Sequence, residues 1–264
     1  MQTKYAPKSP GYVPPLTGIR ALAALLVLGL HTEQNVPVGL DSLLPFFARG
    51  YLGVDFFFIL SGFIITHVYL GSLERFTFRS TRIFLWHRFI RLYPVHLAVL
   101  AGLVVLVSLS GVTGFALNNP QDWGRTDLIW HITLLHAWGF AKHASWNAPS
   151  WSISAEWFAY LLFPLLAPVL MRVRKEATAL CVAVLAVAIT ALLFWLADWT
   201  LNTWVGAPAL IRVAGEFLCG AAICRALAVG KQEHPSGDII GIGALFASSS
   251  GPLSASRNLP SLGF

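Results

Sequence analysis

The chain has 264 residues, of which 56% are hydrophobic and 11% are charged. Soluble domains carry about 25% charged residues, so this chain has too little polar surface for a water-soluble monomer, and its hydrophobicity excludes a disordered chain. Three Cys residues are too few for a disulfide-rich scaffold. The composition therefore predicts an all-α integral membrane protein, with room for about six to seven spans of about 20 residues each.

Six apolar stretches are long enough to cross a bilayer as helices. They are the ranges 16–32, 50–70, 92–112, 152–171, 177–197 and 207–227. A shorter stretch, 127–141, is predicted to be re-entrant, interfacial or a short helix buried among others. The first 15 residues are polar and Pro-rich and no A-x-A-like site follows, so the first stretch is expected to stay as a span.

Lys and Arg residues predict the orientation of the chain, because they concentrate in cytoplasmic loops. With the N-terminus in the cytoplasm and 127–141 not crossing, twelve basic residues lie inside and three outside. The inside set is Lys4, Lys8, Arg75, Arg79, Arg82, Arg88, Arg91, Arg172, Arg174, Lys175, Arg225 and Lys231, and the outside set is Arg49, Arg125 and Lys142. We therefore attribute the net charge of +6 to membrane orientation rather than to nucleic-acid binding.

Arg20 and His31 lie near opposite ends of the first predicted span. Eleven residues turn an α-helix through about three turns plus 20°, so the two side chains share one face, about 16 Å apart along the axis. Imidazole exchanges protons readily near neutral pH, which makes His31 a candidate general base. The alternative is a snorkelling arginine and a polar helix end.

Arg88 and Arg91, in "WHRFIRLYP", share a helix face at the predicted cytoplasmic entry to the third span. Arg75, Arg79 and Arg82 lie close by in the sequence. Guanidinium groups bind phosphate in a bidentate manner, so this group is a candidate site for a phosphate-rich cytosolic donor such as a nucleotide or coenzyme A. The alternative is an anchor on anionic lipid headgroups.

Two carboxylates lie within predicted spans, where ionisable residues are costly and point to function. Asp55 lies among glycines that favour close helix packing, and is predicted to have a buried partner such as Arg20 or another arginine. Glu156 shares a helix face with Ser152. Its carboxylate could orient His31, hold a sugar hydroxyl or pair with an arginine.

Other polar residues receive structural interpretations. Arg212 and Glu216 are spaced i, i+4 and predict a local ion pair. His131, His136 and His143 do not have a familiar ligand spacing, so no metal site is predicted. The sequence contains no G-x-S-x-G, so an acyl-enzyme on a nucleophile elbow is unsupported.

Four segments in this order resemble the membrane acyltransferase-3 family, which includes bacterial O-acetylases of lipopolysaccharide, peptidoglycan and exopolysaccharide. They are "LTGIRALAALLVLGLHT", "GYLGVDFFFILSGFII", "FLWHRFIRLYPVHL" and "APSWSISAEWFAYLLFPLL", and "RVAGEFLCGAAIC" is similar to a further family segment. The family's Arg, ten residues and His match Arg20 and His31. Its R-x-x-R matches Arg88 and Arg91, and its W-S-[LI]-S-x-E matches the stretch that ends at Glu156.

The resemblance implies acyl transfer in the bacterial inner membrane, from cytosolic acetyl-CoA or another acyl-CoA to a hydroxyl of an outer-face glycan or glycolipid. It implies no bound cofactor, with acyl-CoA as the donor substrate. His31 would be the catalytic base, and Arg20 would support it or the donor. Arg88 and Arg91 would bind the coenzyme A phosphates.

Asp55 and Glu156 also match family positions, and Ser152 is a further candidate beside Glu156. Family members are usually longer and have about ten spans, whereas the pattern here stops near residue 230. We therefore expect a C-terminally incomplete acyltransferase domain over 1–230 and a disordered Gly/Ser/Pro-rich tail over 231–264. The alternative is an inactive truncated member or a transporter-like bundle that binds a glycolipid; the complete motif set favours the enzyme.

Overall fold

The computed structural model describes residues 14–35, 49–114, 117, 119–141, 145–201 and 203–233, and within the first helix it describes the side chains of residues 18 and 21–32. The helices are α1 (Pro14–Asn35), α3 (Tyr51–Tyr69), α4 (Phe78–Thr113), α5 (Arg125–Ile132), α6 (Trp151–Arg172), α7 (Glu176–Leu196) and α8 (Ala207–Glu233). Short 3₁₀ helices are η2 (Leu70–Leu73), η3 (Pro120–Trp123), η4 (His136–Trp138) and η5 (Ala148–Ser150). No strand occurs in these residues, which confirms the all-α prediction.

Five helical segments are long and apolar enough to cross a membrane. They are α3 with η2, α4, η5 with α6, α7 and α8, and they correspond to five of the six predicted stretches. The sixth stretch, 16–32, falls in α1, whose described apolar run is the shorter Ala21–Thr32. The stretch 127–141 forms the eight-residue α5 and then η4, and neither is long enough to cross.

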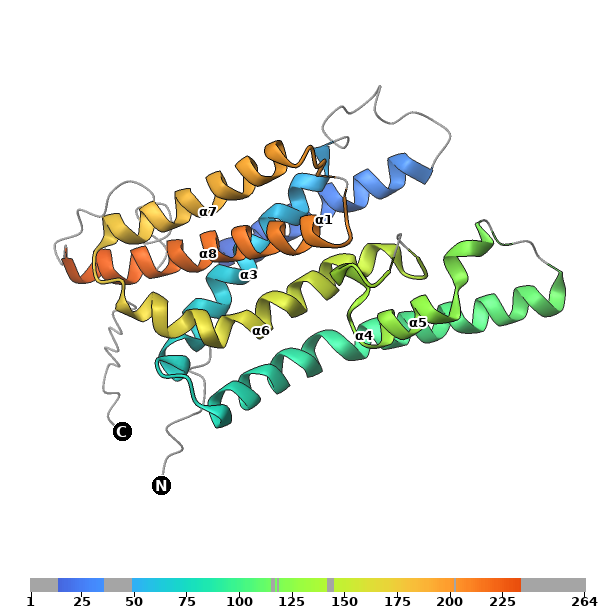
Figure 1. Ribbon diagram of the computed structural model, residues 1–264, viewed down its shortest axis with the longest axis horizontal. Helices are drawn as coiled ribbons and strands as arrows, with labels where there is room; N and C mark the ends of the chain where they lie inside the picture. The colour runs from blue at the N-terminus through green and yellow to red at the C-terminus, as the bar shows by residue number, and fades with distance from the viewer. Residues whose placement is uncertain are drawn as a thin grey trace, which may run out of the picture.

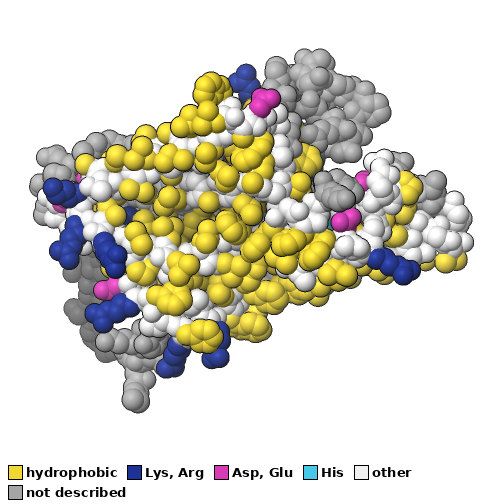
Figure 2. Space-filling model, in the orientation of Figure 1, with side chains coloured by type: hydrophobic (Ala, Val, Ile, Leu, Met, Phe, Trp, Pro, Cys, Tyr) yellow, Lys and Arg dark blue, Asp and Glu magenta, His cyan; other side chains and the backbone are white. Residues whose placement is uncertain are grey.

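Helix α4 begins well before the predicted span 92–112. It has 36 residues and is therefore about 54 Å long, compared with about 30 Å for a bilayer core. Thr77 caps its first turn, where its Oγ1 accepts a hydrogen bond from the Ser80 backbone N–H at 3.2 Å. The arginine-rich segment is thus continuous with the span, and Figure 2 shows Lys and Arg side chains mainly at the end of the molecule where α4 begins and α6 ends. The cytoplasmic N-terminus stays a prediction.

Helix α8 lies between α3 and α7 in the centre of the bundle (Figure 1). Of its apolar window, 61% is buried, compared with 11% for α4 at the outside of the bundle. Gly62 of α3 and Gly220 of α8 let these two helices touch backbone to backbone. A Cβ atom on Gly62 would lie 2.0 Å from the Phe217 carbonyl oxygen, and one on Gly220 would lie 1.8 Å from the Ile59 carbonyl oxygen. Small residues at such crossings allow close packing in the membrane.

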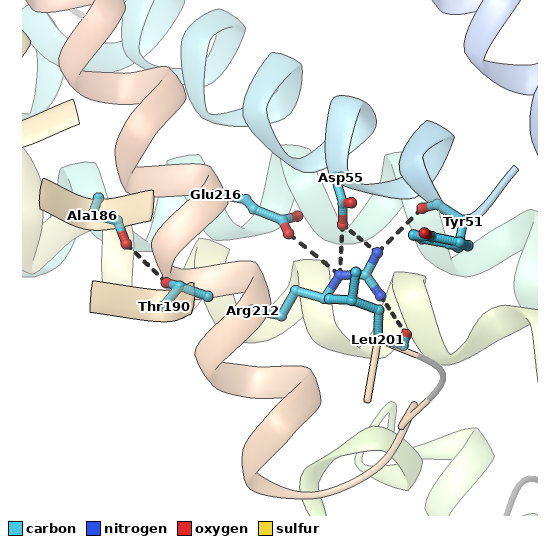
Figure 3. A network of polar contacts seen from close by, with 7 residues as sticks. All are labelled: Tyr51, Asp55, Ala186, Thr190, Leu201, Arg212 and Glu216. Atoms are coloured by element: carbon cyan, nitrogen blue, oxygen red, sulfur yellow. Dashed lines mark hydrogen bonds and ion pairs between the residues drawn. The ribbon is translucent and has the colours of Figure 1, made fainter. Parts of the chain in front are cut away.

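The Arg212 side chain joins α8 to α3 and to the α7–α8 connection (Figure 3). It is 1% exposed, and its Nε donates to Asp55 Oδ1 at 2.6 Å and to Glu216 Oε1 at 3.3 Å. Its Nη1 donates to the Leu201 carbonyl oxygen at 2.9 Å, and its Nη2 donates to Asp55 and to the Tyr51 carbonyl oxygen at 3.2 Å. The predicted Arg212–Glu216 pair is therefore confirmed, and the arginine that pairs with Asp55 is Arg212.

Gly220→Ala is expected to destabilise the protein by about 1–3 kcal/mol, because the added methyl group overlaps the Ile59 carbonyl oxygen and forces α3 and α8 apart. The measurement is the midpoint of thermal unfolding of the purified protein in detergent. Gly102→Ala in α4 is the control, since nothing lies within 4 Å of a Cβ atom there, and alanine favours a helix. Equal midpoints for the two variants would contradict the packing.

Arg212→Met is expected to destabilise the protein by about 3–5 kcal/mol, because it leaves two carboxylates in a buried site without their cation. The same unfolding measurement tests it. Arg174→Met, at an exposed position after α6, is the matched control and should unfold like the parent. Replacing Asp55 by Asn in the Arg212→Met background should restore part of the lost stability, because it removes one of the unpaired charges. If it restores none, an unpaired charge is not the cause of the destabilisation.

Candidate active site

A cavity of about 420 Å³ lies between α1, α3, α4 and α6. This volume is in the range of small-molecule sites. Its apolar lining consists of Val27, Val54, Phe57, Phe58, Ile64, Ile65 and Leu92. Its polar lining consists of Ser61 from α3, Arg88 and Arg91 from α4, and Ser152, Glu156 and Tyr160 from α6. Four of the predicted site residues, namely Arg88, Arg91, Ser152 and Glu156, are therefore brought together.

The two arginines contribute positive charge to this cavity. Arg88 Nη2 donates to the Tyr69 hydroxyl at 2.8 Å, and the guanidinium carbon lies 4.9 Å from the centre of the same ring. Tyr69 is buried and packs edge-on against Phe84 at 5.0 Å, so it holds Arg88 in place. Arg91 is exposed. In the described part of the chain no carboxylate pairs with either arginine, which leaves their charge available to an anionic ligand.

Glu156 contributes the negative charge. Its Oε1 accepts hydrogen bonds from the Ser61 hydroxyl and, at 2.6 Å, from the Tyr160 hydroxyl. The two hydroxyl oxygens lie 3.4 Å apart. Among the described residues Glu156 Oε2 has no hydrogen-bond partner, and this oxygen can accept a hydrogen bond from a ligand in the cavity. One predicted alternative was an arginine partner for Glu156. The structure instead shows the hydroxyl groups of Ser61 and Tyr160 as its partners.

His31 lies one helical turn beyond the cavity wall. Its Nδ1 is 2.8 Å from the carbonyl oxygen of Val27, which lines the cavity. Because a carbonyl oxygen only accepts, Nδ1 is the donor in this contact, and the contact orients the imidazole ring. Asp55 lies in the Arg212 network instead of the cavity lining. The side chain of Arg20 is outside the described part of the structure.

Three hydroxyl residues of the site were not predicted from the sequence: Ser61, Tyr69 and Tyr160. Tyr160 had a usable signal, because it follows Glu156 at i, i+4 and therefore shares its helix face. Ser61 stands in "FILSGF", inside a segment that carried the family resemblance, but no local spacing links it to Glu156. Tyr69 had no signal in the sequence.

A second cluster of polar side chains is formed by His96, His131 and His136. All three are buried, and the ring centres of His131 and His136 lie 3.9 Å apart. The His96 ring is parallel to that of His136 at 5.8 Å. In the described ranges no three side chains are arranged to hold a metal ion, and His143 lies outside those ranges.

Burial, with the neighbouring imidazoles, lowers the pKa of His131 from 6.5 to about 3. Burial also lowers the pKa of His136, to about 4, with a contribution from His96. Both rings are therefore neutral in the folded protein at neutral pH. Unfolded imidazoles bind protons below about pH 6.5 while the folded ones do not, so acid favours the unfolded state.

The unfolding midpoint is expected to fall as the pH is lowered from about 6.5 to 4, and to level off near pH 3, where the folded rings are protonated too. His131→Gln/His136→Gln should flatten this dependence, as measured by thermal unfolding in detergent across that pH range. His67→Gln, at an exposed position, is the control and should retain the slope. If the unfolding midpoint of the double variant depended on pH as strongly as that of the parent, His131 and His136 would not be the cause of the acid destabilisation.

A family model described as an acyltransferase domain matches residues 15–260. The chain is similar to acyltransferase MdmB of Streptomyces mycarofaciens, with 31% identity over 187 residues, or 67% of this chain and 45% of the relative. It is also similar to peptidoglycan O-acetyltransferase OatA of Listeria monocytogenes, with 32% identity over 174 residues, or 61% of this chain and 25% of the relative. The chain thus spans less than half the length of these relatives, and no solved structure matches it.

Proposed function

This chain belongs to the membrane acyltransferase-3 family, and from that membership we propose that it transfers an acyl group, acetyl in the simplest case, from cytosolic acyl-CoA to a hydroxyl group. The acceptor that we propose is a glycan or glycolipid on the outer face of a bacterial inner membrane. The name of MdmB supports acyl transfer, and the name of OatA supports transfer of acetyl to oxygen.

The observation that carries the proposal is one cavity that holds both a cationic and an anionic group. Two guanidinium groups without carboxylate partners in the described residues face it from α4, and Glu156 faces it from α6. Arg88 and Arg91 bind the phosphates of the donor by charge-assisted hydrogen bonds. The apolar lining accommodates the acyl group and the arm that carries the thioester.

His31 is proposed to receive the proton of the acceptor hydroxyl, because imidazole is the commonest general base and the Val27 contact orients its ring. Arg20 is proposed to support His31 or the donor. Glu156 Oε2 accepts a hydrogen bond from a hydroxyl in the cavity, and Ser152, one turn before it, contributes a second polar group. In the overall reaction the acyl group moves from the sulfur of coenzyme A to the acceptor oxygen, and coenzyme A leaves as a thiolate.

Multiple-turnover release of coenzyme A from acetyl-CoA by the purified chain, with water as acceptor, tests this function. His31→Ala should abolish steady-state release while thermal unfolding stays normal. Arg91→Ala should raise the KM for acetyl-CoA about tenfold or more, since a hydrogen bond to a charged group contributes about 1.5–3 kcal/mol. Its effect on S-acetyl-N-acetylcysteamine, a thioester without phosphates, should be small.

Arg174→Ala, exposed and outside the cavity, is the control for the arginine variant. Steady-state turnover in His31→Ala would contradict the role of the base. An Arg91→Ala variant that is impaired equally on both thioesters would contradict phosphate binding. A folded wild-type chain that binds glycolipid and releases no coenzyme A would favour the non-catalytic bundle.

A further inference from the structure

The Ser61 hydroxyl makes an unusual contact for a serine inside a helix. Hydroxyl groups in helices commonly donate to a carbonyl group of the preceding turn, as Ser108 and Thr113 of α4 do at 2.8 and 2.9 Å. Ser61 instead donates across the cavity wall to Glu156 Oε1 on α6. It lies ten residues into α3, near the middle of a candidate span. The hydroxyl and a carboxylate are thus paired inside the cavity.

Tyr160 orients the carboxylate of this pair. Its hydroxyl donates to the same Glu156 oxygen at 2.6 Å. Its ring is 3% exposed and is held edge-on by Phe84 at 6.2 Å and Phe217 at 6.4 Å. A nucleophile in hydrogen-bond reach of a base, with that base oriented by a third group, is the arrangement of nucleophilic catalysis. The three residues fit these roles as Ser61, Glu156 and Tyr160.

The packing of α3 determines which way Ser61 points. The next residue, Gly62, presses on the Phe217 backbone of α8. Adjacent helix residues are about 100° apart, so the contact of Gly62 with α8 turns Ser61 away from α8 and toward α6. Ser61 and Tyr160 both line the cavity, but Ser61 is half-buried, whereas the Tyr160 ring is buried and fixed among aromatic side chains. Ser61 is therefore the more accessible of the two residues that donate to Glu156.

The distance to the arginines suits a coenzyme A thioester. Tyr69, which contacts Arg88, follows Ser61 by eight residues in the helical segment, which corresponds to about 12 Å along the axis. The extended pantetheine arm of coenzyme A is longer than this. Phosphates at Arg88 and Arg91 therefore allow the thioester carbon to reach Ser61 Oγ.

We propose that Ser61 is a nucleophile that carries the acyl group as an oxygen ester between donor and acceptor. This rests on the acyl-CoA donor of the proposed function. Ser61 Oγ bonds to the thioester carbonyl carbon, its proton passes to Glu156, and the carbon–sulfur bond breaks to release coenzyme A as a thiolate. The acceptor oxygen then bonds to the same carbon and its proton passes to His31, while Ser61 leaves and takes back the proton from Glu156.

A covalent intermediate in mid-span has a simple consequence for transfer across a membrane. The donor and the acceptor need not occupy the cavity at the same time, since the acyl group stays on the protein between the two steps. The two half-reactions also use different bases. Glu156 accepts the proton of Ser61 in the donor half-reaction, and His31 accepts the proton of the acceptor in the second.

The test is to incubate the purified chain with radiolabelled acetyl-CoA and to locate bound label by peptide mass spectrometry. We expect one acetyl group per chain on Ser61, removed by hydroxylamine, with a matching burst of coenzyme A. Ser61→Ala and Glu156→Gln should lose label and burst. Tyr160→Phe should form the same adduct more slowly. Ser108→Ala, whose hydroxyl bonds within α4 outside the cavity, should label like the parent.

Two further variants separate this proposal from the proposed function. His31→Ala should retain the single burst and the label on Ser61 while losing steady-state turnover. Ser61→Cys should form a thioester adduct, which hydroxylamine removes more readily than the oxygen ester on Ser61. Formation of this new adduct requires a folded protein, so the result cannot be explained by unfolding of the variant.

Label on Tyr160, or steady-state release without any adduct, would overturn the Ser61 relay and leave the proposed function standing. Unimpaired steady-state release by Ser61→Ala would do the same. A wild-type chain with neither coenzyme A release nor label would overturn the donor assignment together with the relay.

Discussion

The buried guanidinium group of Arg212 is the interaction on which the bundle depends. It joins α8 to Asp55 and the Tyr51 carbonyl group of α3, and to the Leu201 carbonyl group before α8. Removing one charge from such a site is far more costly than the net stability that the site contributes, because the remaining charges are left without partners in a medium of low polarity. The position of α8 against α3 is therefore fixed at one end by charge.

Further along the same pair of helices, position is fixed by shape. Gly62 and Gly220 remove the side chains that would separate the α3 and α8 backbones, and in a membrane such close packing replaces the hydrophobic effect as the source of association. Charge at one end and close contact in the middle orient α3 about its own axis. One face of α3 then meets α8, and the adjacent face, with Ser61, meets α6 and the cavity.

The cavity follows from this arrangement, because its walls come from four helices and its chemistry from their adjacent faces. Arg88 is held by Tyr69, at the C-terminal end of α3, whereas Arg212 contacts the N-terminal end of that helix. Glu156 is held by hydroxyl groups from α3 and from its own helix. Helix α3 thus connects the stabilising network, the cationic part and the anionic part of the site, and a shift of this helix would disturb all three.

The amino-acid sequence by itself determined the features that depend on neighbours along one helix. Composition and length indicated the spans, since hydropathy is summed over consecutive residues. The i, i+4 spacing indicated the Arg212–Glu216 pair, and the i, i+3 spacing placed Arg88 and Arg91 on one face, which the structure turns to the cavity. The ordered motifs indicated the family.

Tertiary structure alone decided the contacts between helices. Asp55 and Arg212 are 157 residues apart, and Ser61 and Glu156 are 95 residues apart. Periodicity carries no information about such pairs, because spanning helices are apolar on most faces and have no strong amphipathic pattern to say which face meets which neighbour. The pairing is decided by where glycine permits contact and where a buried charge finds its counter-charge, and both become visible only when the helices are packed.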